Sequence, residues 1–540
     1  MKTYRDIFKW GDKREENLDK GMLKLLVDKF RLSAADMEKI NLFGIEEINL
    51  DDKISIQESV ILQFKNICGD ANVFSTKEER ATHAYGKHFL ELLKLRLGII
   101  DNPPDLVIYP NNSEEILRIV QICNNHRIPI IPFGGGSSVT IALQCIGGGI
   151  CLDLSKNFNK VIKINETNST VTTKTGIMGP ELEKALNERG YTCGHFPQSF
   201  EYSTVGGWIA ARGAGTLSTG YGKIEEMVLA LKVVTPTGII ETKDYPADAE
   251  AIDLNKLFIG SEGVFGVITE ACLKIRRYQP ENTAYASFIF KSFEQAVESM
   301  RETMQAGYGK PHLFRISDPD ETDIAFKIKG FDDSFSNKVL KVLGYEPGIR
   351  TLMFAAIEGS SKYPEFVKKC LKKTAKKHQG LYIGQKPVKK WLEQRYSSAY
   401  ARDPVMDKGI ITDTFETSVS WENLMPLWNA VRIYLNSRKL TVVMVHISHV
   451  YENGANLYFT FLSPWEKGRE IEDYQQFHKG LVDTIVNNKG SLSHHHGIGR
   501  VLSPWMKEEY SETGISTLEA LKKHFDPQNI MNPGGMLGLI

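Results

Sequence analysis

The sequence is poor in the features that mark secreted, membrane-spanning and nucleic-acid-binding proteins. Its 540 residues contain seven cysteines and no CxxC pair, so we expect reduced, mostly buried thiols rather than a disulfide framework. Lysine plus arginine and aspartate plus glutamate each number 66, and the resulting net charge of zero argues against nucleic acid as the main partner. No apolar run approaches the ~18 residues that indicate a membrane span.

Targeting signals and common cofactor motifs are also scarce. The first eight residues lack the apolar core of a secretory signal, and the final Gly-Leu-Ile is not a peroxisomal Ser-Lys-Leu tail, so we expect a cytoplasmic protein. No GxGxxG with a downstream ribose-binding carboxylate lies in a βαβ pattern, which argues against a Rossmann domain. Because there is no HExxH motif and no matching set of cysteine and histidine partners, we predict no metal site.

What the sequence does contain is a group of short loops rich in small residues. The first loop follows a helix predicted over 113–126 and a strand predicted over 128–133. Glycine lets the backbone come close to a ligand, and its N–H groups, with two serine hydroxyls, can cradle a pyrophosphate. Taken alone, such a loop is a plain connection between elements as often as it is a phosphate-binding loop. Its residues are Pro132, Phe133, Gly134, Gly135, Gly136, Ser137 and Ser138.

Three further stretches complete the pattern. The second loop starts at Pro197 and contains Gln198, Ser199, Phe200, Glu201, Tyr202, Ser203 and Thr204, and it is followed by Ala211, Arg212, Gly213 and Ala214. The third loop contains Ser261, Glu262, Gly263, Val264, Phe265, Gly266, Val267 and Ile268. The histidine loop, 493–499, carries His494, His495 and His496 ahead of two glycines.

Together and in this order, these stretches and Glu416-Thr417-Ser418 resemble the flavin-binding family that includes vanillyl-alcohol oxidase and the D-lactate dehydrogenases. Within it they are most similar to the alkyldihydroxyacetonephosphate synthases of ether-lipid synthesis, from about His83 to the C-terminus. The resemblance implies an α+β fold, with a two-part FAD-binding domain of the vanillyl-alcohol oxidase (PCMH) type and a cap of antiparallel sheet plus helices. It also implies that the loop residues named above bind FAD. Since the first loop lacks the histidine used for covalent attachment, we expect non-covalent FAD.

The patterns along the chain predict four regions. Residues 1–100 form a helical region, in which a second helix begins near Ser33. Residues 101–278 form the FAD-binding domain, residues 279–485 the cap, and residues 486–540 a segment that returns to the flavin. Strands are predicted over 151–154, 169–173, 227–235, 286–290, 351–357 and 457–462, and helices from Pro180 and over 293–304.

The candidate catalytic residues are Tyr458, His494, His495 and His496. In a strand, at most two of three consecutive histidines face one site. The run is a metal site, a solvated surface or a lining of the flavin pocket, and the resemblance implies the last, with imidazoles that hold an anion or move protons. The pattern around Tyr458 by itself favours a packed core tyrosine. The resemblance implies an active-site tyrosine, which acts as an acid or base if a neighbouring imidazolium or arginine lowers its pKa.

Two arginines are candidates for substrate binding. Arg402 precedes Asp403, and Arg315 is flanked by apolar residues, so each forms either an ion pair or an anion site. A guanidinium binds phosphate or carboxylate through two parallel hydrogen bonds. The resemblance places both arginines near a substrate that carries a phosphate and an acyl group.

The resemblance implies an FAD-dependent transferase that exchanges the acyl group of acyl-dihydroxyacetonephosphate for a long-chain fatty alcohol, without net redox. The alternative is an FAD-linked oxidoreductase of a 2-hydroxy acid or related alcohol, in which arginine binds the carboxylate and histidine takes the hydroxyl proton. A flavin- or lipid-binding protein without turnover is a third possibility. Six lysines at helical spacing over 368–377 form either a solvated face or a peripheral contact with an anionic membrane. The sequence leaves open whether the protein forms a homodimer.

Overall fold

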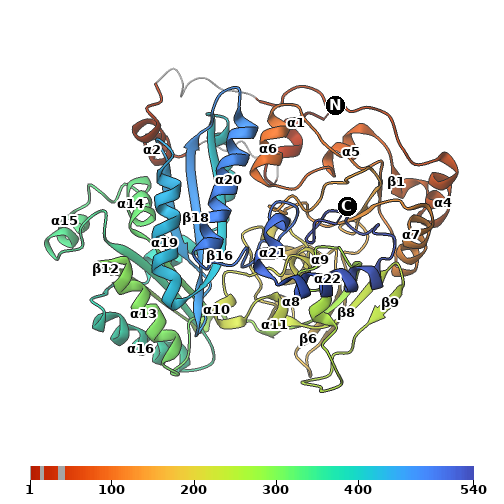
Figure 1. Ribbon diagram of the computed structural model, residues 1–540. Helices are drawn as coiled ribbons and strands as arrows, with labels where there is room; N and C mark the ends of the chain where they lie inside the picture. Colours follow the sequence, from red (N-terminus) through yellow and green to blue (C-terminus); the bar gives the residue numbers. More distant parts are fainter. Residues whose placement is uncertain (1, 12–17, 34–42, 540) are drawn as a thin grey trace.

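The computed structural model describes residues 2–11, 18–33 and 43–539. Within them the strands form four sheets, and the helices lie beside and between these sheets (Figure 1). The predicted α+β class is therefore confirmed. The helix expected from Ser33 falls on residues outside the described ranges.

The first sheet is small and holds the first loop at its edge. Its strands β2, β4 and β3 run parallel, and β1 is antiparallel to β2. Helix α7 (Ser113–His126) joins β2 to β3, as predicted, because Asn112 caps it and its apolar face is buried against the sheet. In spatial order the strands are β1 (Val73–Phe74), β2 (Leu106–Ile108), β4 (Ile150–Asp153) and β3 (Ile130–Phe133).

The second sheet is antiparallel and carries the other two loops. The second loop leads into helix α9 (Val205–Ala210), and the third loop ends at the start of β10. A two-stranded ribbon of β7 (Tyr191–Thr192) and β11 (Arg276–Arg277) lies beside it. Helices α8 (Gly179–Asn187), α10 (Ser218–Tyr221), α11 (Ile224–Met227) and α12 (Asn255–Phe258) connect the strands. The strands, in spatial order, are β5 (Val161–Asn165), β6 (Thr170–Lys174), β10 (Val267–Lys274), β8 (Val228–Thr235) and β9 (Gly238–Glu241).

The cap is built on a seven-stranded antiparallel sheet. Helices α19 (Trp421–Asn436) and α20 (Glu470–Asn487) lie in front of its strands β16 and β18 in Figure 1. Helix α19 buries Leu424, Leu427, Val431 and Leu435, a spacing of three and four that puts all four on one helical face. The strand order is β15 (Leu381–Gly384), β12 (Thr283–Phe290), β14 (Thr351–Glu358), β13 (Leu313–Ser317), β17 (Val442–Ile447), β18 (Gly454–Pro464) and β16 (Ile410–Ser420).

The other helices of the cap include the predicted helix over 293–304, which is α13. That helix spans Phe293–Gln305, and Ser292 caps it. The remaining ones are α14 (Pro319–Ile328), α15 (Phe335–Val342), α16 (Tyr363–Lys377), α17 (Lys386–Glu393) and α18 (Ser397–Met406). The predicted strands recur as β4, β6, β8, β12, β14 and β18, shifted by a few residues at their ends.

Ion pairs tie two of the N-terminal helices to the cap. Arg96 of α6 (Phe89–Arg96) bonds Asp403 of the cap, and Arg5 of α1 (Tyr4–Phe8) pairs with Asp407. The other helices here are α2 (Lys20–Phe30), α4 (Glu58–Cys68) and α5 (Lys77–Thr82). At the other end, α21 (Met506–Glu509) and α22 (Glu512–Phe525) cross in front of the second sheet (Figure 1). The division of the chain into four regions stays a prediction.

The lysine-rich helix is α16, and some of its lysines interact with other side chains. Lys368 pairs with Glu365, Lys377 pairs with Glu302, and Lys372 lies 4.0 Å from the centre of the Tyr382 ring. None of the described helices has the length and apolar character needed to cross a bilayer.

Candidate active site

The structure brings the first, second and third loops together. A Cβ atom on Gly135 would collide with the carbonyl oxygen of Tyr202, and one on Gly134 would collide with the Thr204 hydroxyl. The third loop also reaches the first, because a Cβ on Gly263 would lie 2.8 Å from Pro132. Glycine is therefore required at these positions by close approach of the loops themselves.

The first loop keeps its backbone donors free. Within the part of the chain that the structure describes, the N–H groups of residues 135–138 donate no hydrogen bond. Such a row of free N–H groups at the end of a strand is a suitable cradle for a phosphate. The histidine loop is tied to the third loop, because the N–H of Gly499 donates to Glu262 at 2.7 Å.

Several predicted cofactor residues point elsewhere with their side chains. Phe200 stacks on Trp208 in the core, and Arg212 is more than half exposed and pairs with Glu225. Gln198 donates to the Arg395 carbonyl of the cap at 2.8 Å. The apolar members of the third loop are also core residues, so any contact that they make with a cofactor uses the backbone. They are Val264, Phe265, Val267 and Ile268.

A row of polar side chains crosses the cap sheet. Glu416 on β16 is directly opposite Tyr458 on β18, and Tyr458 is opposite His446 on β17. His446 is in turn opposite Ser317 on β13. Directly opposed residues share one face of an antiparallel sheet, so the four side chains lie on the same face.

The histidine loop is held against this row by one carboxylate. Glu416, which is 2% exposed, accepts the backbone N–H groups of His494, His495 and His496 at 2.7, 3.1 and 3.0 Å. It also accepts the Ser493 hydroxyl at 2.6 Å, and Nδ1 of His495 lies 3.3 Å from it. Because these residues form bends rather than a strand, the alternation expected for a strand does not apply. The three imidazoles gather, with ring centres 5.2 and 4.5 Å apart along the run.

Burial and charge set the protonation of this cluster. Burial lowers the pKa of His496 to about 4 and that of His494 well below its usual range, so both rings are neutral at pH 7. Burial alone would raise the pKa of Glu416. The adjacent His495 and the other two imidazoles outweigh it and hold this pKa well below the usual carboxyl range.

Tyr458 lies among the histidines, and its pKa is raised rather than lowered. Its ring stacks on His446 at 4.6 Å and on His495 at 5.9 Å. Burial raises the pKa of Tyr458 to about 12, and the Glu416 charge adds to the rise. The condition of a lowered pKa is therefore not met, because desolvation of the phenolate exceeds the effect of Arg402. Tyr458 is a neutral hydrogen-bond donor at pH 7.

Sequence reasoning missed several neighbours of the histidines. Tyr451 bonds Nε2 of His494 at 2.6 Å, and the Lys223 ammonium donates to the His494 carbonyl at 2.5 Å. His449 stacks on His494 at 5.0 Å. Ring nitrogens of His449, His494 and His495 lie within 4.8 Å of one another, so among the described residues these three could hold a cation. The buried Lys223 ammonium beside them opposes a cation there, and the absence of a metal stays a prediction.

Another missed residue is His195, which precedes the second loop. It is 1% exposed, and neither ring nitrogen has a hydrogen-bond partner among the described residues. Its Nε2 lies 3.7 Å from the position of a Cβ on Gly213. A buried imidazole without partners is costly unless a ligand supplies them.

The two candidate arginines differ. Arg402 donates through Nη1 to the Lys87 carbonyl at 3.0 Å, while its buried Nε and Nη2 have no partner among the described residues. Its neighbour Asp403 is engaged with Arg96 instead, so it leaves Arg402 available for an anion. The Arg315 guanidinium, in contrast, donates to Glu321 at 2.5 Å.

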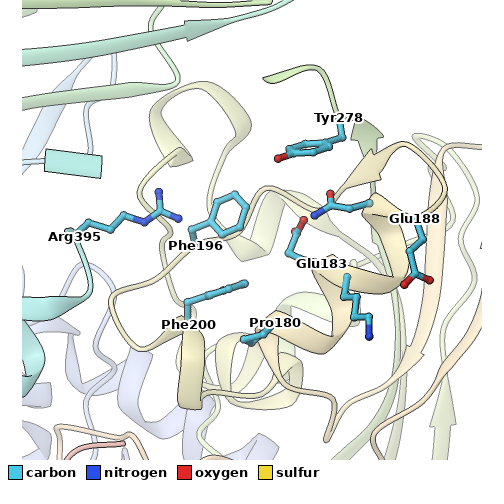
Figure 2. A pocket seen from close by; sticks show the side chains of 9 residues that line it. Pro180, Glu183, Glu188, Phe196, Phe200, Tyr278 and Arg395 are labelled. Carbon is cyan, nitrogen blue, oxygen red and sulfur yellow. The ribbon is translucent and has the colours of Figure 1, made fainter. Parts of the chain in front are cut away.

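A surface hollow lies apart from these groups (Figure 2). Its volume is about 740 Å³, and Arg395 extends toward Phe196 at one side of it, 5.0 Å from the ring centre. It contains none of the candidate catalytic histidines. Its lining is Pro180, Glu183, Lys184, Asn187, Glu188, Phe196, Phe200, Tyr278 and Arg395.

Comparisons with known proteins agree with this geometry. Residues 104–243 match the family model described as an FAD binding domain, and residues 279–536 match that of the FAD linked oxidases, C-terminal domain. An alkyldihydroxyacetonephosphate synthase of Dictyostelium discoideum is 34% identical over 482 residues, which cover 86% of this chain and 78% of the relative. The Trypanosoma brucei brucei synthase is also 34% identical, over 85% of this chain and 77% of its own length. An uncharacterized FAD-linked oxidoreductase of Escherichia coli K12, YgcU, is 30% identical over 81% of this chain and 90% of its own.

Solved structures give the same result. A structure of alkyldihydroxyacetonephosphate synthase superimposes with a TM-score of 0.83 at 29% identity, covering 98% of this chain and 99% of the other. p-Cresol methylhydroxylase, at 14% identity, 90% and 98% coverage and a TM-score of 0.67, shares the fold. The predicted PCMH-type fold and FAD as cofactor are confirmed. The chain belongs to the alkyldihydroxyacetonephosphate synthase family of FAD-binding proteins.

Proposed function

We propose that this protein is an FAD-dependent transferase that exchanges the acyl group of acyl-dihydroxyacetonephosphate for a long-chain fatty alcohol. The observation that carries the proposal is the combination of Arg402, a buried cation with two free nitrogens, with Tyr458. Tyr458 is neutral at pH 7, and the Arg402 charge opposes the rise that burial causes in its pKa, so the two side chains are electrostatically coupled. An anchored anion beside groups that transfer protons is what an exchange at a phosphate-bearing substrate requires.

FAD fits the free groups of the loops. The N–H groups of residues 135–138 would hold the pyrophosphate, and the partnerless ring nitrogens of His195 would bond the cofactor where the second loop turns. No histidine lies in the first loop, which supports non-covalent binding. When bound, the flavin supplies the centre that activates the substrate carbon, without net oxidation or reduction.

The side chains of Tyr458 and of the histidine loop would transfer the protons. Tyr458, protonated at neutral pH, donates a hydrogen bond to an oxygen of the substrate. His496, neutral at that pH, accepts a proton from the substrate. Nδ1 of His495 lies 3.3 Å from Glu416, so the carboxylate fixes the orientation of this imidazole beside Tyr458.

One observation favours a second candidate function. Glu321 engages Arg315, which leaves Arg402 as the free guanidinium of the predicted pair. A single free cation suits the one carboxylate of a 2-hydroxy acid. An FAD-linked oxidoreductase of such an acid is therefore the alternative proposal.

The test supplies acyl-dihydroxyacetonephosphate and labelled hexadecanol and measures labelled alkyl product. In parallel, anaerobic mixing with D-lactate or glycolate is followed by flavin absorbance. Alkyl product without bleaching supports the transferase. Bleaching by a hydroxy acid, without alkyl product, supports the oxidoreductase.

The lysines of α16 fit a peripheral contact with an anionic membrane, where a fatty alcohol resides. Lys369, Lys373 and Lys376 are exposed, and no ion pair engages them within the described part of the chain. Each lysine near such a surface contributes about 1 kcal/mol. Cosedimentation with phosphatidylserine vesicles, but not with phosphatidylcholine vesicles, is the expected result, and substitution of these three lysines by glutamine should abolish it.

A further inference from the structure

The neutralisation of Arg315 is specific and built into the cap. Its Nη2 donates to Oε1 of Glu321 at 2.5 Å, and Ser317 donates to the same oxygen at 2.8 Å. The side chains of Arg315 and Glu321 are 13% and 15% exposed. The guanidinium also lies 5.1 Å from the centre of the Trp391 ring. This is a largely buried ion pair, which water screens weakly.

Glu321 also binds the imidazole that supports Tyr458. Nδ1 of His446 lies 3.0 Å from Oε2 of Glu321, and the His446 ring stacks on Tyr458 with an interplanar angle of 13°. An ionised carboxylate only accepts hydrogen bonds, so Nδ1 of His446 carries the proton. Glu321 therefore connects Arg315 to the stacked row of aromatic and imidazole rings.

The carboxylate keeps its charge at all working pH values. Burial would raise the pKa of Glu321, but Arg315 and His446 outweigh it and hold this pKa far below the usual range. Burial also lowers the pKa of His446 to about 4, so this ring is neutral. The group of three thus has a net charge near zero, although it contains an arginine.

Arg315 still has a free donor. Its Nε is buried and has no hydrogen-bond partner among the described residues. An anion that approaches this nitrogen also meets the fixed negative charge of Glu321. Like charges placed together in this way oppose binding and determine which partners are accepted.

We propose that Glu321 is a specificity-determining residue that screens Arg315 and so limits the affinity of the site for doubly charged phosphate groups. The inference rests on the proposed function, in which a phosphate-bearing substrate binds near Arg315 and Arg402. Glu321 makes Arg402 the principal anchor and leaves Arg315 as a weak second one. Loss of the Glu321 charge therefore strengthens phosphate binding.

The experiment uses Glu321→Gln, Arg315→Met and the double variant in the full-length, FAD-loaded protein. Glutamine keeps the shape and can still accept from Ser317. Two quantities are measured: KM for acyl-dihydroxyacetonephosphate in the exchange reaction, and Kd for dihydroxyacetone phosphate from the change in flavin absorbance without turnover. Glu321→Gln should lower both by about tenfold or more. Arg315→Met should raise them less than threefold in the wild type, but should cancel the whole gain in the Glu321→Gln background.

Asp473→Asn is the matched control, because Asp473 is also 15% exposed and pairs with an arginine, Arg438, at 2.6 Å. It should leave KM and Kd unchanged. Glu321→Asp, which withdraws the carboxylate by one methylene, should give intermediate values and replaces Glu321→Gln if that variant loses flavin. An unchanged or higher Kd in Glu321→Gln would overturn the proposal, since the carboxylate would then position Arg315 rather than screen it. If the wild type makes no alkyl product, the proposed function fails, but the Kd values still report on the screening.

Discussion

Replacing Glu416 by glutamine tests whether this carboxylate shapes the histidine loop. The side chain accepts three backbone N–H groups and one hydroxyl and is almost fully buried. An amide has the same shape but presents one oxygen and one NH₂ group. In either orientation the NH₂ group meets backbone donors, so at least one N–H of the loop loses its acceptor.

The magnitude follows from these contacts. A hydrogen bond to a charged group contributes about 1.5–3 kcal/mol, and a buried donor left without a partner costs about 1–3 kcal/mol. We expect Glu416→Gln to lower the free energy of unfolding by about 2–4 kcal/mol. Each 1.4 kcal/mol that also acts on the transition state is a tenfold loss of rate, so exchange per bound flavin should fall by about 10–10³-fold.

The assay combines urea unfolding with initial exchange rates normalised to flavin content. Glu183→Gln is the matched control: Glu183 is buried and accepts two backbone N–H groups and the Thr192 hydroxyl, but it lies in the surface hollow. The Glu183→Gln variant should lose stability without losing exchange rate.

The wild type should also lose stability as the pH falls below about 4.5, because the pKa of Glu416 is lower in the folded state than in the unfolded state. This pH-dependent loss should be absent in Glu416→Gln. Equal rates in Glu416→Gln and wild type would refute the reasoning.

Four other groups of the fold and the site can be tested separately. Burial lowers the pKa of His478 to about 4, so the stability that this neutral ring contributes is complete above pH 6.5 and is lost as the pH falls toward 4. His478→Phe should reduce the slope of the unfolding free energy against pH in this window by up to about 1.4 kcal/mol per pH unit. An unchanged slope would contradict this prediction. Gly135→Val should load no FAD, because its side chain collides with backbone, and acid precipitation of the wild type should release yellow flavin; flavin in the washed pellet would disprove non-covalent binding. Arg402→Lys should be impaired, and Arg402→Leu more so, because lysine keeps the charge but not the planar fork; full exchange activity in the leucine variant eliminates the anchor. Tyr458→Phe should lose about 10²–10⁴-fold in exchange rate and, combined with His495→Ala, less than the product of both losses; near wild-type exchange returns Tyr458 to core packing.

Local patterns in the sequence were sufficient to predict several elements. The helix over 113–126 has an Asn112 cap and an apolar face at helical spacing, and the structure reproduces its bounds. The glycine loops were recognisable because their backbones approach other loops too closely for any side chain, as at Gly135. The helix bounds depend on residues that are neighbours in the sequence, and the loops are marked by glycines that no other residue can replace.

Contacts between distant residues could not be predicted in the same way. The position of Glu416 beneath the histidine loop depends on the pairing of β16 with β18 and on a loop almost 80 residues later. The pairing of Arg315 with Glu321 depends on where β13 ends and α14 begins. The direction of the Tyr458 pKa shift could not be predicted, because the sequence shows which charges are present but not how completely the phenol is buried.

The most direct test of the account counts product against flavin. The FAD-loaded protein is mixed anaerobically with acyl-dihydroxyacetonephosphate and labelled hexadecanol, and the flavin spectrum is recorded while alkyl product and free fatty acid are quantified. The account predicts many equivalents of both products per flavin, in equal amounts, with the starting spectrum restored when substrate is exhausted. No alkyl product, together with flavin that stays bleached after addition of D-lactate or glycolate, would contradict it.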